Sequence, residues 1–309
     1  MSRKAVLFAG QGAQAVGMGK DLAEAFPEVR ALFDRANQAM GYDLAAICFD
    51  GPDAELTKSS NTQPAIFVVS LAAYTLLRAQ CPSVRFDYAA GLSSGEWTAL
   101  HVAGVLTYED TLKVLEARGR FMQEACERAP GAMLSVIGLG EDALAAICAE
   151  AGVALANLNS RDQTVLSGAR DAIVKAEGLA KEAGAKRAIP LNVAGAFHSP
   201  LMDEAAARLR EVLAGIPLKF PEFPVISNVT GKPHSDPESI RAAMVDQVTS
   251  SVRWVHGIEW LRSQGVGEYV ECGPGKVLTG LVKRIDKEAH LHTIHGLSSL
   301  EGVVKALDA

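Results

Sequence analysis

Two apolar segments that each end in a glycine turn constrain the fold of this chain most strongly. Residues 3–9 are rich in Val, Leu and Phe, and they run directly into Gly10-Gln11-Gly12. Residues 86–90 run in the same way into a second glycine turn at 91–95. Helical patterns follow these turns, over residues 21–40, 62–80 and 107–128. Strands that alternate with helices and end in glycine loops are typical of an α/β domain with a mostly parallel sheet.

The middle of the chain has a different order of elements. The pattern predicts strands and helices in the order β-α-β-β-α-β, over residues 132–139, 141–151, 153–158, 164–167, 171–183 and 186–191. This order is typical of a ferredoxin-like subdomain. We therefore expect a small ferredoxin-like subdomain at 129–197, inserted into a larger α/β subdomain made of 1–128 and 198–309. A cleft should lie between the two.

Composition and charge exclude several classes of protein. The 30 basic and 36 acidic residues give a net charge of −6, without the basic excess of a non-specific nucleic-acid binder. The longest nearly uncharged apolar run, 64–78, is shorter than the ~20 residues that span a bilayer. The apolar part of the first residues, 5–9, is too short for a secretory signal peptide. The five cysteines and the histidines at 290–295 show no metal-ligand spacing. We expect a cytoplasmic protein with no metal, nucleic-acid or membrane partner.

The segment Gly91-Leu92-Ser93-Ser94-Gly95 has the form G-x-S-x-G, and it lies between a predicted strand and a predicted helix. Glycines at both ends allow a tight turn that lifts the central serine hydroxyl out of the sheet, and the next backbone N–H can stabilise an oxyanion. We therefore predict Ser93 as a nucleophile, although a glycine-rich turn with a capping serine would have the same pattern. Ser94 is not at the centre of the motif.

A serine nucleophile needs a base, and His198 is the strongest candidate among the seven histidines. It precedes a predicted helix whose N-cap would be Ser199. The positive end of that helix should disfavour the imidazolium ion and keep the ring neutral. A loop histidine with a structural hydrogen bond is the alternative interpretation.

The turn after the first strand also has two interpretations. With Ala15, the glycines at 10 and 12 satisfy G-x-G-x-x-A, which could bind a dinucleotide. However, the sequence lacks a second strand that ends in an acidic residue at the proper distance. We favour the other use of such a turn, which is to offer a backbone N–H to an oxyanion.

Arg118 lies on the apolar face of the helix predicted at 107–128, where a charged side chain is unexpected. At about 100° per residue, it falls between Leu115 and Met122 in the apolar arc. A buried guanidinium needs an anion or several acceptors. Arg118 could therefore form a structural ion pair with a buried carboxylate, or it could clamp the carboxylate of a substrate.

Several segments together resemble a known family. The chain contains, in the expected order, GQGAQ, TQPAIF, GLSSGEWTAL, ARGRFMQ, GAMLSVIGL, NLNSRDQTVLSG, GAFHSPLM and ECGPGKVLTGL. It resembles malonyl-CoA:acyl carrier protein transacylases and the acyltransferase domains of fatty-acid and polyketide synthases, from about Val6 to Ile285. The resemblance implies an α/β-hydrolase-like core with the inserted ferredoxin-like subdomain.

The resemblance also implies roles for individual residues. Ser93 would accept the acyl group and His198 would be its general base. A main-chain carbonyl, here that of Gln247, would orient the histidine, and Asn228 in the SNVT segment is assigned to the same task. The chain departs from the family at Leu92, where members commonly carry His.

The remaining roles concern the substrate. Gln11 and Ser94 would supply the N–H groups of the oxyanion hole. Arg118 would bind the malonyl carboxylate in a pocket lined by Gln63, and Phe197 matches the pattern associated with malonyl rather than methylmalonyl units.

The resemblance implies ping-pong transfer of malonyl from malonyl-CoA, through an acyl-serine, to the phosphopantetheine thiol of acyl carrier protein. No cofactor is needed, and we expect a monomer. Basic pairs at 186–187 and 283–284 are candidates for steering an acidic carrier protein. A serine thioesterase or esterase on the same fold is the nearest alternative, and a dinucleotide-binding protein is the alternative from another class.

Overall fold

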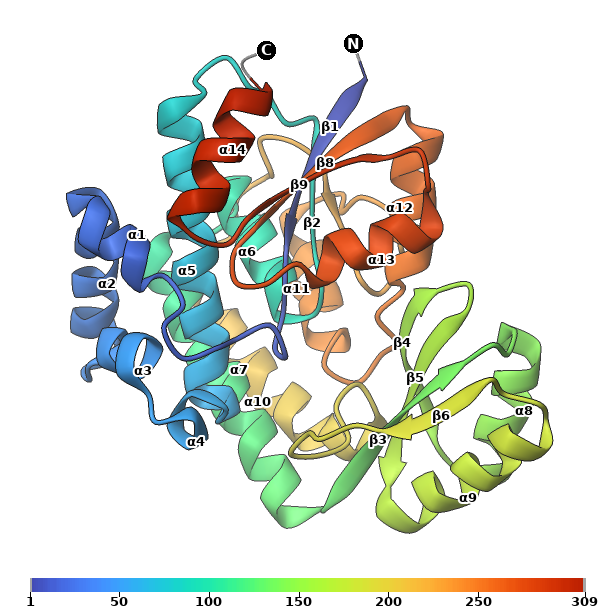
Figure 1. Ribbon diagram of the computed structural model, residues 1–309. Coiled ribbons are helices and arrows are strands. Elements are labelled where there is room, and N and C mark those ends of the chain that lie inside the picture. The colour runs from blue at the N-terminus through green and yellow to red at the C-terminus, as the bar shows by residue number, and fades with distance from the viewer. Residues whose placement is uncertain (1, 308–309) are drawn as a thin grey trace.

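The computed structural model describes residues 2–307, and a parallel sheet forms its centre (Figure 1). Within these residues the sheet has five strands in the order β7-β2-β1-β8-β9, and all neighbouring strands are parallel. The strands are β1 (Arg3–Phe8), β2 (Tyr88–Gly91), β7 (Val225–Ile226), β8 (Val266–Cys272) and β9 (His290–Ile294). The predicted α/β class with a parallel sheet is confirmed.

Helices cover both faces of this sheet, as the alternation of β1 requires. Val6 and Phe8 point into a core shared with α5 and α7, whereas Ala5 and Leu7 point into a core shared with α12 and α13. The helices of this large part are α1 (Lys20–Ala25), α2 (Pro27–Met40), α3 (Leu44–Asp50), α4 (Asp53–Leu56), α5 (Ser59–Gln80), α6 (Ser94–Val102), α7 (Tyr108–Arg128), η1 (Pro200–Met202), α10 (Asp203–Ala214), α11 (Pro237–Asp246), α12 (Trp254–Ser263), α13 (Val277–Ile285) and α14 (Leu297–Leu307).

Two helix boundaries differ from those predicted. The helix expected at 21–40 is two helices, because Phe26 is extended and Pro27 begins α2; the residue before a proline is disfavoured in helical geometry. Helix α5 begins at Ser59, earlier than expected, with Pro64 inside it. By contrast, α7 begins where predicted, and the Thr107 hydroxyl accepts a hydrogen bond from the Asp110 N–H.

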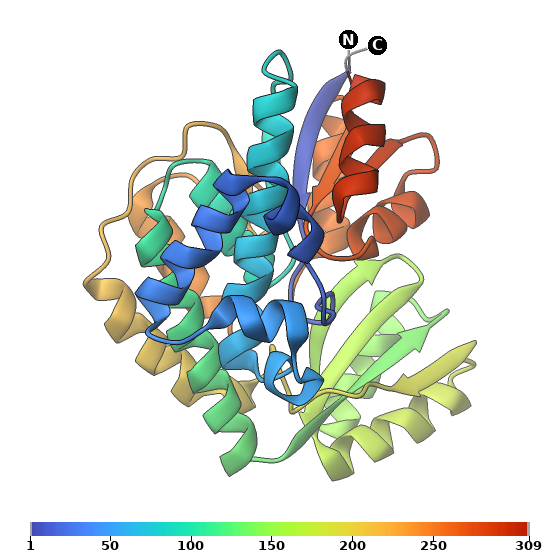
Figure 2. The ribbon, with the colours of Figure 1, turned by 60° about the vertical axis from the view of Figure 1, so that its left-hand side comes forward.

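A second, antiparallel sheet is formed by β3 (Gly131–Ile137), β4 (Ala154–Ser160), β5 (Gln163–Ala169) and β6 (Arg187–Pro190), in the order β4-β5-β3-β6. With α8 (Glu141–Ala151) and α9 (Arg170–Glu182), the elements follow the predicted order β-α-β-β-α-β. Figures 1 and 2 show this sheet beyond the carboxyl ends of β1 and β2. Two backbone hydrogen bonds join it to the large part: the Val252 N–H donates to the Ala156 carbonyl of β4, and the Leu158 N–H of β4 donates to the Val252 carbonyl.

Over residues 2–307, no helix combines the length and apolar character needed to cross a bilayer. The same residues hold no group of three or more His, Cys, Asp or Glu side chains arranged to bind a metal ion.

Candidate active site

The serine of the G-x-S-x-G segment sits in a strained turn between β2 and α6. Ser93 has φ 54° and ψ −113°, a conformation that non-glycine residues rarely adopt and that costs about 1–3 kcal/mol. A Cβ on Gly91 would overlap the backbone of Gly95, and a Cβ on Gly95 would overlap the Phe8 carbonyl. Both glycines are therefore required by close backbone approach, which explains the spacing of the motif.

Asn228 holds this turn from the loop that follows β7. Its Oδ1 accepts from the Ser93 N–H at 2.7 Å, and its Nδ2 donates to the Gly91 carbonyl at 2.7 Å. The structure thus corrects the role predicted for Asn228: its side chain binds the serine turn rather than the histidine. These two hydrogen bonds of the Asn228 side-chain amide, one to Gly91 and one to Ser93, help to hold the strained Ser93 conformation.

His198 lies directly against the serine. The distance between Ser93 Oγ and His198 Nε2 is 2.9 Å, and His198 Nδ1 lies 2.8 Å from the main-chain oxygen of Gln247. Because a carbonyl only accepts, Nδ1 carries the proton and the Nε2 lone pair faces the hydroxyl. Burial, with a smaller contribution from the charge of Arg118, lowers the pKa of His198 to about 4. The ring is therefore neutral at pH 7 and can accept a proton.

The segment around His198 has the predicted local structure but a different electrostatic effect. Ser199 caps the short helix η1 by accepting from the Leu201 N–H. We expected the helix terminus to keep the imidazole neutral, whereas burial is the main cause of the low pKa. His198 itself has φ 57°, so both members of the Ser–His pair occupy strained backbone positions.

Arg118 projects from α7 into the same site and is 1% exposed. Its Nη1 donates to Gln63 Oε1 at 2.7 Å, and its Nη2 donates to Gln247 Oε1 at 3.0 Å and to Ser93 Oγ at 3.1 Å. Within the described residues its hydrogen bonds thus go to neutral acceptors, and nothing accepts from Nε. Burial lowers the pKa of Arg118 to about 10. A buried, charged guanidinium without a contacting carboxylate fits a site that receives an anion.

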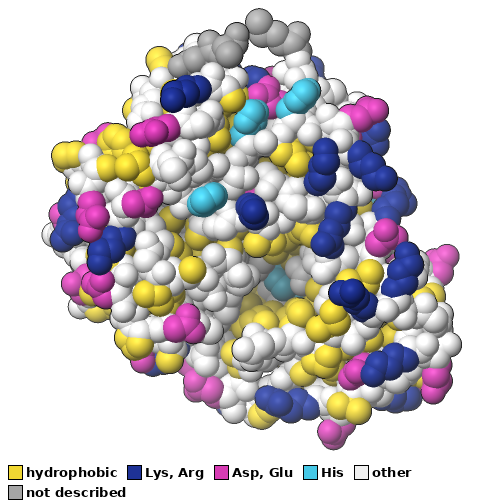
Figure 3. Space-filling view, viewed as in Figure 1, with side chains coloured by type: hydrophobic (Ala, Val, Ile, Leu, Met, Phe, Trp, Pro, Cys, Tyr) yellow, Lys and Arg dark blue, Asp and Glu magenta, His cyan; other side chains and the backbone are white. Residues whose placement is uncertain are grey.

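These side chains open into a cleft of about 710 Å³, a volume suited to a small-molecule substrate. Ser93, Arg118 and His198 line it from the large part, and Phe197 and residues of β4 and β5 line it from the side of the small sheet. Figure 3 shows the hollow, with hydrophobic side chains around it and Lys and Arg side chains gathered along its right-hand rim. The structure therefore brings the predicted nucleophile, base and guanidinium together.

The other predicted site residues lie around the same centre. Gln11 and Leu92 line the cleft, and Ser94 is the first residue of α6. A Cβ on Gly10 would overlap the Leu92 carbonyl, so the turn after β1 packs directly on the serine turn. The first helix begins only at Lys20. The Gly10 turn thus does not open a helix, as a dinucleotide-binding turn must, and that interpretation fails.

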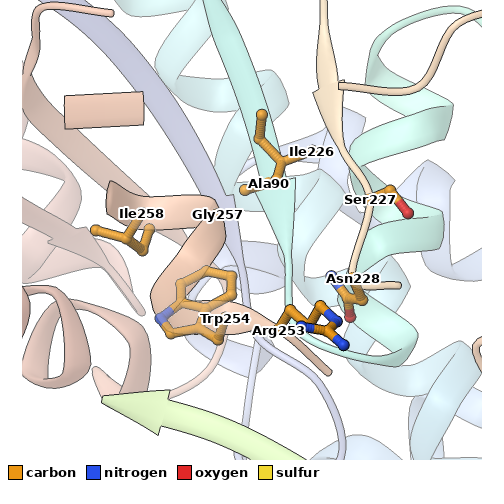
Figure 4. Close-up of a pocket in the computed structure, with 8 residues that line it drawn as sticks. All are labelled: Ala90, Ile226, Ser227, Asn228, Arg253, Trp254, Gly257 and Ile258. Atoms are coloured by element: carbon orange, nitrogen blue, oxygen red, sulfur yellow. The ribbon is translucent and has the colours of Figure 1, made fainter. Parts of the chain in front are cut away.

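Behind the serine turn there is a second pocket of about 10 Å³, about the space of one water molecule (Figure 4). Asn228, Arg253 and Trp254 line it. It is too small for a substrate, so the large cleft is the candidate active site.

Glu96 and His234 are site residues that were not predicted from the sequence. Glu96 is 1% exposed and accepts hydrogen bonds from His234, from Gln247 and from the Asn228 backbone. A signal was present in the sequence, because Glu96 follows Ser93 by three residues in an otherwise apolar helical segment. A carboxylate so close to the nucleophile could have been singled out.

Comparison with known proteins gives consistent results. The model of the acyl transferase domain family matches residues 6–297. Malonyl CoA-acyl carrier protein transacylases of Haemophilus influenzae and Bacillus subtilis are 41% and 40% identical to the chain; each match covers 99% of this chain and 100% or 98% of the relative, respectively. The crystal structure of an acyl carrier protein S-malonyltransferase from Vibrio cholerae superposes with a TM-score of 0.93 at 42% identity, covering 98% of this chain and 100% of that one.

A further similar structure holds a partner protein. It shows a type II PKS acyl carrier protein in complex with its malonyl-transacylase, and it matches with a TM-score of 0.93 at 40% identity. The match covers 99% of this chain and 100% of the other.

Proposed function

Because this chain belongs to the acyl transferase domain family, we propose that it transfers the malonyl group from malonyl-CoA to the phosphopantetheine thiol of acyl carrier protein. The observation that carries the proposal is the buried Arg118 guanidinium, which contacts only neutral groups of the described chain and lies 3.1 Å from Ser93 Oγ. Relatives that cover nearly the whole chain are named for this activity.

In the first half-reaction, Ser93 Oγ attacks the thioester carbonyl carbon while His198 Nε2 takes the hydroxyl proton. The backbone N–H groups of Gln11 and Ser94 stabilise the oxyanion, supported by the positive end of α6. When the carbon–sulfur bond breaks, His198 returns its proton to the sulfur of CoA. The products are malonyl-Ser93 and free CoA.

The second half-reaction runs through the same groups. The phosphopantetheine thiol gives its proton to His198 and attacks the malonyl-serine carbonyl. Collapse of the tetrahedral intermediate forms the new thioester, and His198 returns the proton to Ser93 Oγ. Throughout, the Gln247 main-chain oxygen holds Nδ1–H, so the imidazole keeps one orientation and tautomer.

Three residues select the acyl group in this scheme. Arg118 binds the malonyl carboxylate in a charge-assisted contact, and Gln63 fixes the guanidinium through Nη1. Phe197, on the cleft wall, limits the space beside the acyl group. These groups, with Ser93 and His198, supply the chemistry without a cofactor.

We further infer that residues 1–128 and 198–309 form an α/β-hydrolase-like core and that residues 129–197 form a ferredoxin-like subdomain. The parallel sheet with its strained serine turn supports the first, and the strand order β4-β5-β3-β6 supports the second. Within residues 2–307 the five cysteines form no disulfide bond, which suits the reducing cytoplasm, and we propose that the protein is a monomer there.

Acyl carrier protein would dock at the basic rim of the cleft seen in Figure 3. Lys283 and Arg284 lie in the last turn of α13, and Arg284 both lines the cleft and donates to Gln163 of the small sheet. Lys186 and Arg187 lie at the start of β6. Positive charge here would steer an acidic carrier protein although the chain as a whole is negative.

Mass spectrometry after brief mixing with a panel of acyl-CoAs tests the proposal. We expect a malonyl adduct on the peptide that contains Ser93 and its transfer to holo acyl carrier protein on addition of that protein. The serine thioesterase alternative instead predicts rapid release of malonate by water without an acceptor thiol. A stable adduct with a neutral acyl group and none with malonyl would contradict the proposed substrate.

A further inference from the structure

A buried carboxylate behind the Ser–His pair takes no part in the reaction steps. Glu96 Oε2 accepts from Gln247 Nε2 at 2.5 Å and from the Asn228 N–H at 3.2 Å. Its Oε1 lies 2.7 Å from His234 Nε2, and the His234 side chain is buried as well. Three residues between 228 and 247, each at least 132 positions from Glu96, thus meet on one side chain of α6.

This carboxylate sets the orientation of the Gln247 side-chain amide. An ionised carboxylate only accepts hydrogen bonds, so the amide NH2 of Gln247 must face Glu96. The same nitrogen donates to the Ser93 carbonyl at 3.0 Å. The amide oxygen therefore faces the other way, where it accepts from Arg118 Nη2. If the amide turned over, its NH2 would meet the guanidinium donor to donor.

The position of Glu96 also leaves the Arg118 guanidinium without a direct carboxylate partner. A carboxylate in direct contact with Arg118 would occupy the N–H groups that a substrate carboxylate needs. Glu96 is instead separated from Arg118 by the Gln247 amide, and its charge still favours the charged form of the guanidinium and opposes the lowering of the Arg118 pKa by burial.

We propose that Glu96 is a positioning residue for acyl-group selection, which acts through the Gln247 amide to align the Arg118 guanidinium with a substrate carboxylate. The inference rests on the proposed function, because it concerns discrimination between malonyl and neutral acyl groups. Loss of the alignment should weaken malonyl transfer more than acetyl transfer, since only malonyl uses the guanidinium.

Two substitutions separate this role from a general effect on folding. Glu96→Asp keeps the charge but withdraws the carboxylate from Gln247. Glu96→Gln keeps the reach and an acceptor oxygen for Gln247 and Asn228, while its NH2 can donate to the other tautomer of His234. The measurement is the ratio of kcat/KM for malonyl-CoA to that for acetyl-CoA, with active sites counted by burst amplitude.

For Glu96→Asp we expect the malonyl-to-acetyl ratio to fall at least about tenfold, and for Glu96→Gln to stay within about threefold of the wild type. A ratio unchanged in both variants, or lowered more by Gln than by Asp, would overturn the proposal. Glu271→Asp is the matched control: this carboxylate is equally buried, but it binds the backbone of Leu278 and Thr279. We expect it to lower stability without changing the ratio.

A double-mutant cycle of Glu96→Asp with Gln247→Ala tests the route of the effect. Because Glu96 acts through Gln247, adding Glu96→Gln or Glu96→Asp to Gln247→Ala should change the ratio less than about twofold. Independent effects on the ratio would show that Glu96 acts by another path. Wild-type protein that failed to load malonyl would refute the proposed function itself. If the wild type loads malonyl and the Glu96 variants keep its malonyl-to-acetyl ratio, only this inference is refuted.

Discussion

Replacing Arg118 with Ala should reverse the acyl selectivity of the site. The malonyl carboxylate would then be buried without a partner, which costs about 3–5 kcal/mol for a well-desolvated pair. Since each 1.4 kcal/mol is about tenfold, kcat/KM for malonyl-CoA should fall by at least about two orders of magnitude. An acetyl group has no carboxylate, so its transfer should fall little or rise. The unpaired oxygens of Gln63 and Gln247 affect both substrates and cancel in the ratio.

Rapid-quench mass spectrometry of acyl-Ser93 formation with malonyl-CoA and acetyl-CoA measures the two constants, and circular dichroism checks that the variant is folded. The matched control is Arg120→Ala on the same helix. Arg120 is exposed and pairs with Glu116 and Glu124 on the surface, so its loss should leave the ratio unchanged. An unchanged ratio in folded Arg118→Ala, or equal losses for both substrates, would mean that Arg118 has only a structural role.

Four further predictions address the serine turn and the base. Ser93→Ala should abolish the covalent adduct in intact-mass spectra while the melting temperature stays close to wild type; an adduct on the variant would mean that another residue is the nucleophile. His198→Ala should slow acylation by about 10²–10⁴-fold but leave malonyl-CoA binding measurable by calorimetry. In the wild type, the acylation rate should fall only as the pH drops through about 4, where His198 takes up a proton. The free energy of unfolding should decrease from about pH 6.5 downward, because the histidine of the unfolded chain takes up a proton first. An acylation rate that falls to half near pH 6.5 would contradict the argument that burial lowers the pKa of His198. Gly95→Ala should prevent stable folding, since its Cβ would overlap the Phe8 carbonyl, and a soluble, active variant would show that the turn can relax.

Local sequence determined the secondary-structure elements of this protein and which of their side chains are buried. The strand–turn–helix context of Ser93 could be predicted because it depends on neighbouring residues: two glycines permit close backbone approach, and apolar runs define the flanking elements. The burial of Arg118 followed from the 3.6-residue period of α7, which places it among Leu115 and Met122. The order of elements along the chain in the small part, β-α-β-β-α-β, followed from alternating short apolar segments and helical patterns. The roles of Gln247 and Asn228 came only from resemblance to a family.

Tertiary structure decided how these parts meet. Ser93 and His198 are 105 positions apart, and Arg118 and Gln247 are 129 apart. No periodicity links such residues, since their contact depends on the packing of helices and sheets that lie far apart along the chain. The same packing turned the Asn228 amide toward the serine turn rather than the histidine, and it gathered Gln247, Asn228 and His234 on Glu96. A hydrogen bond requires a donor–acceptor distance set within a few tenths of an ångström and a restricted angle. Hydrophobic patterning specifies only which face of an element is buried. The sequence pattern thus determined the elements and their buried faces, and the folded arrangement alone decided which polar atoms face one another.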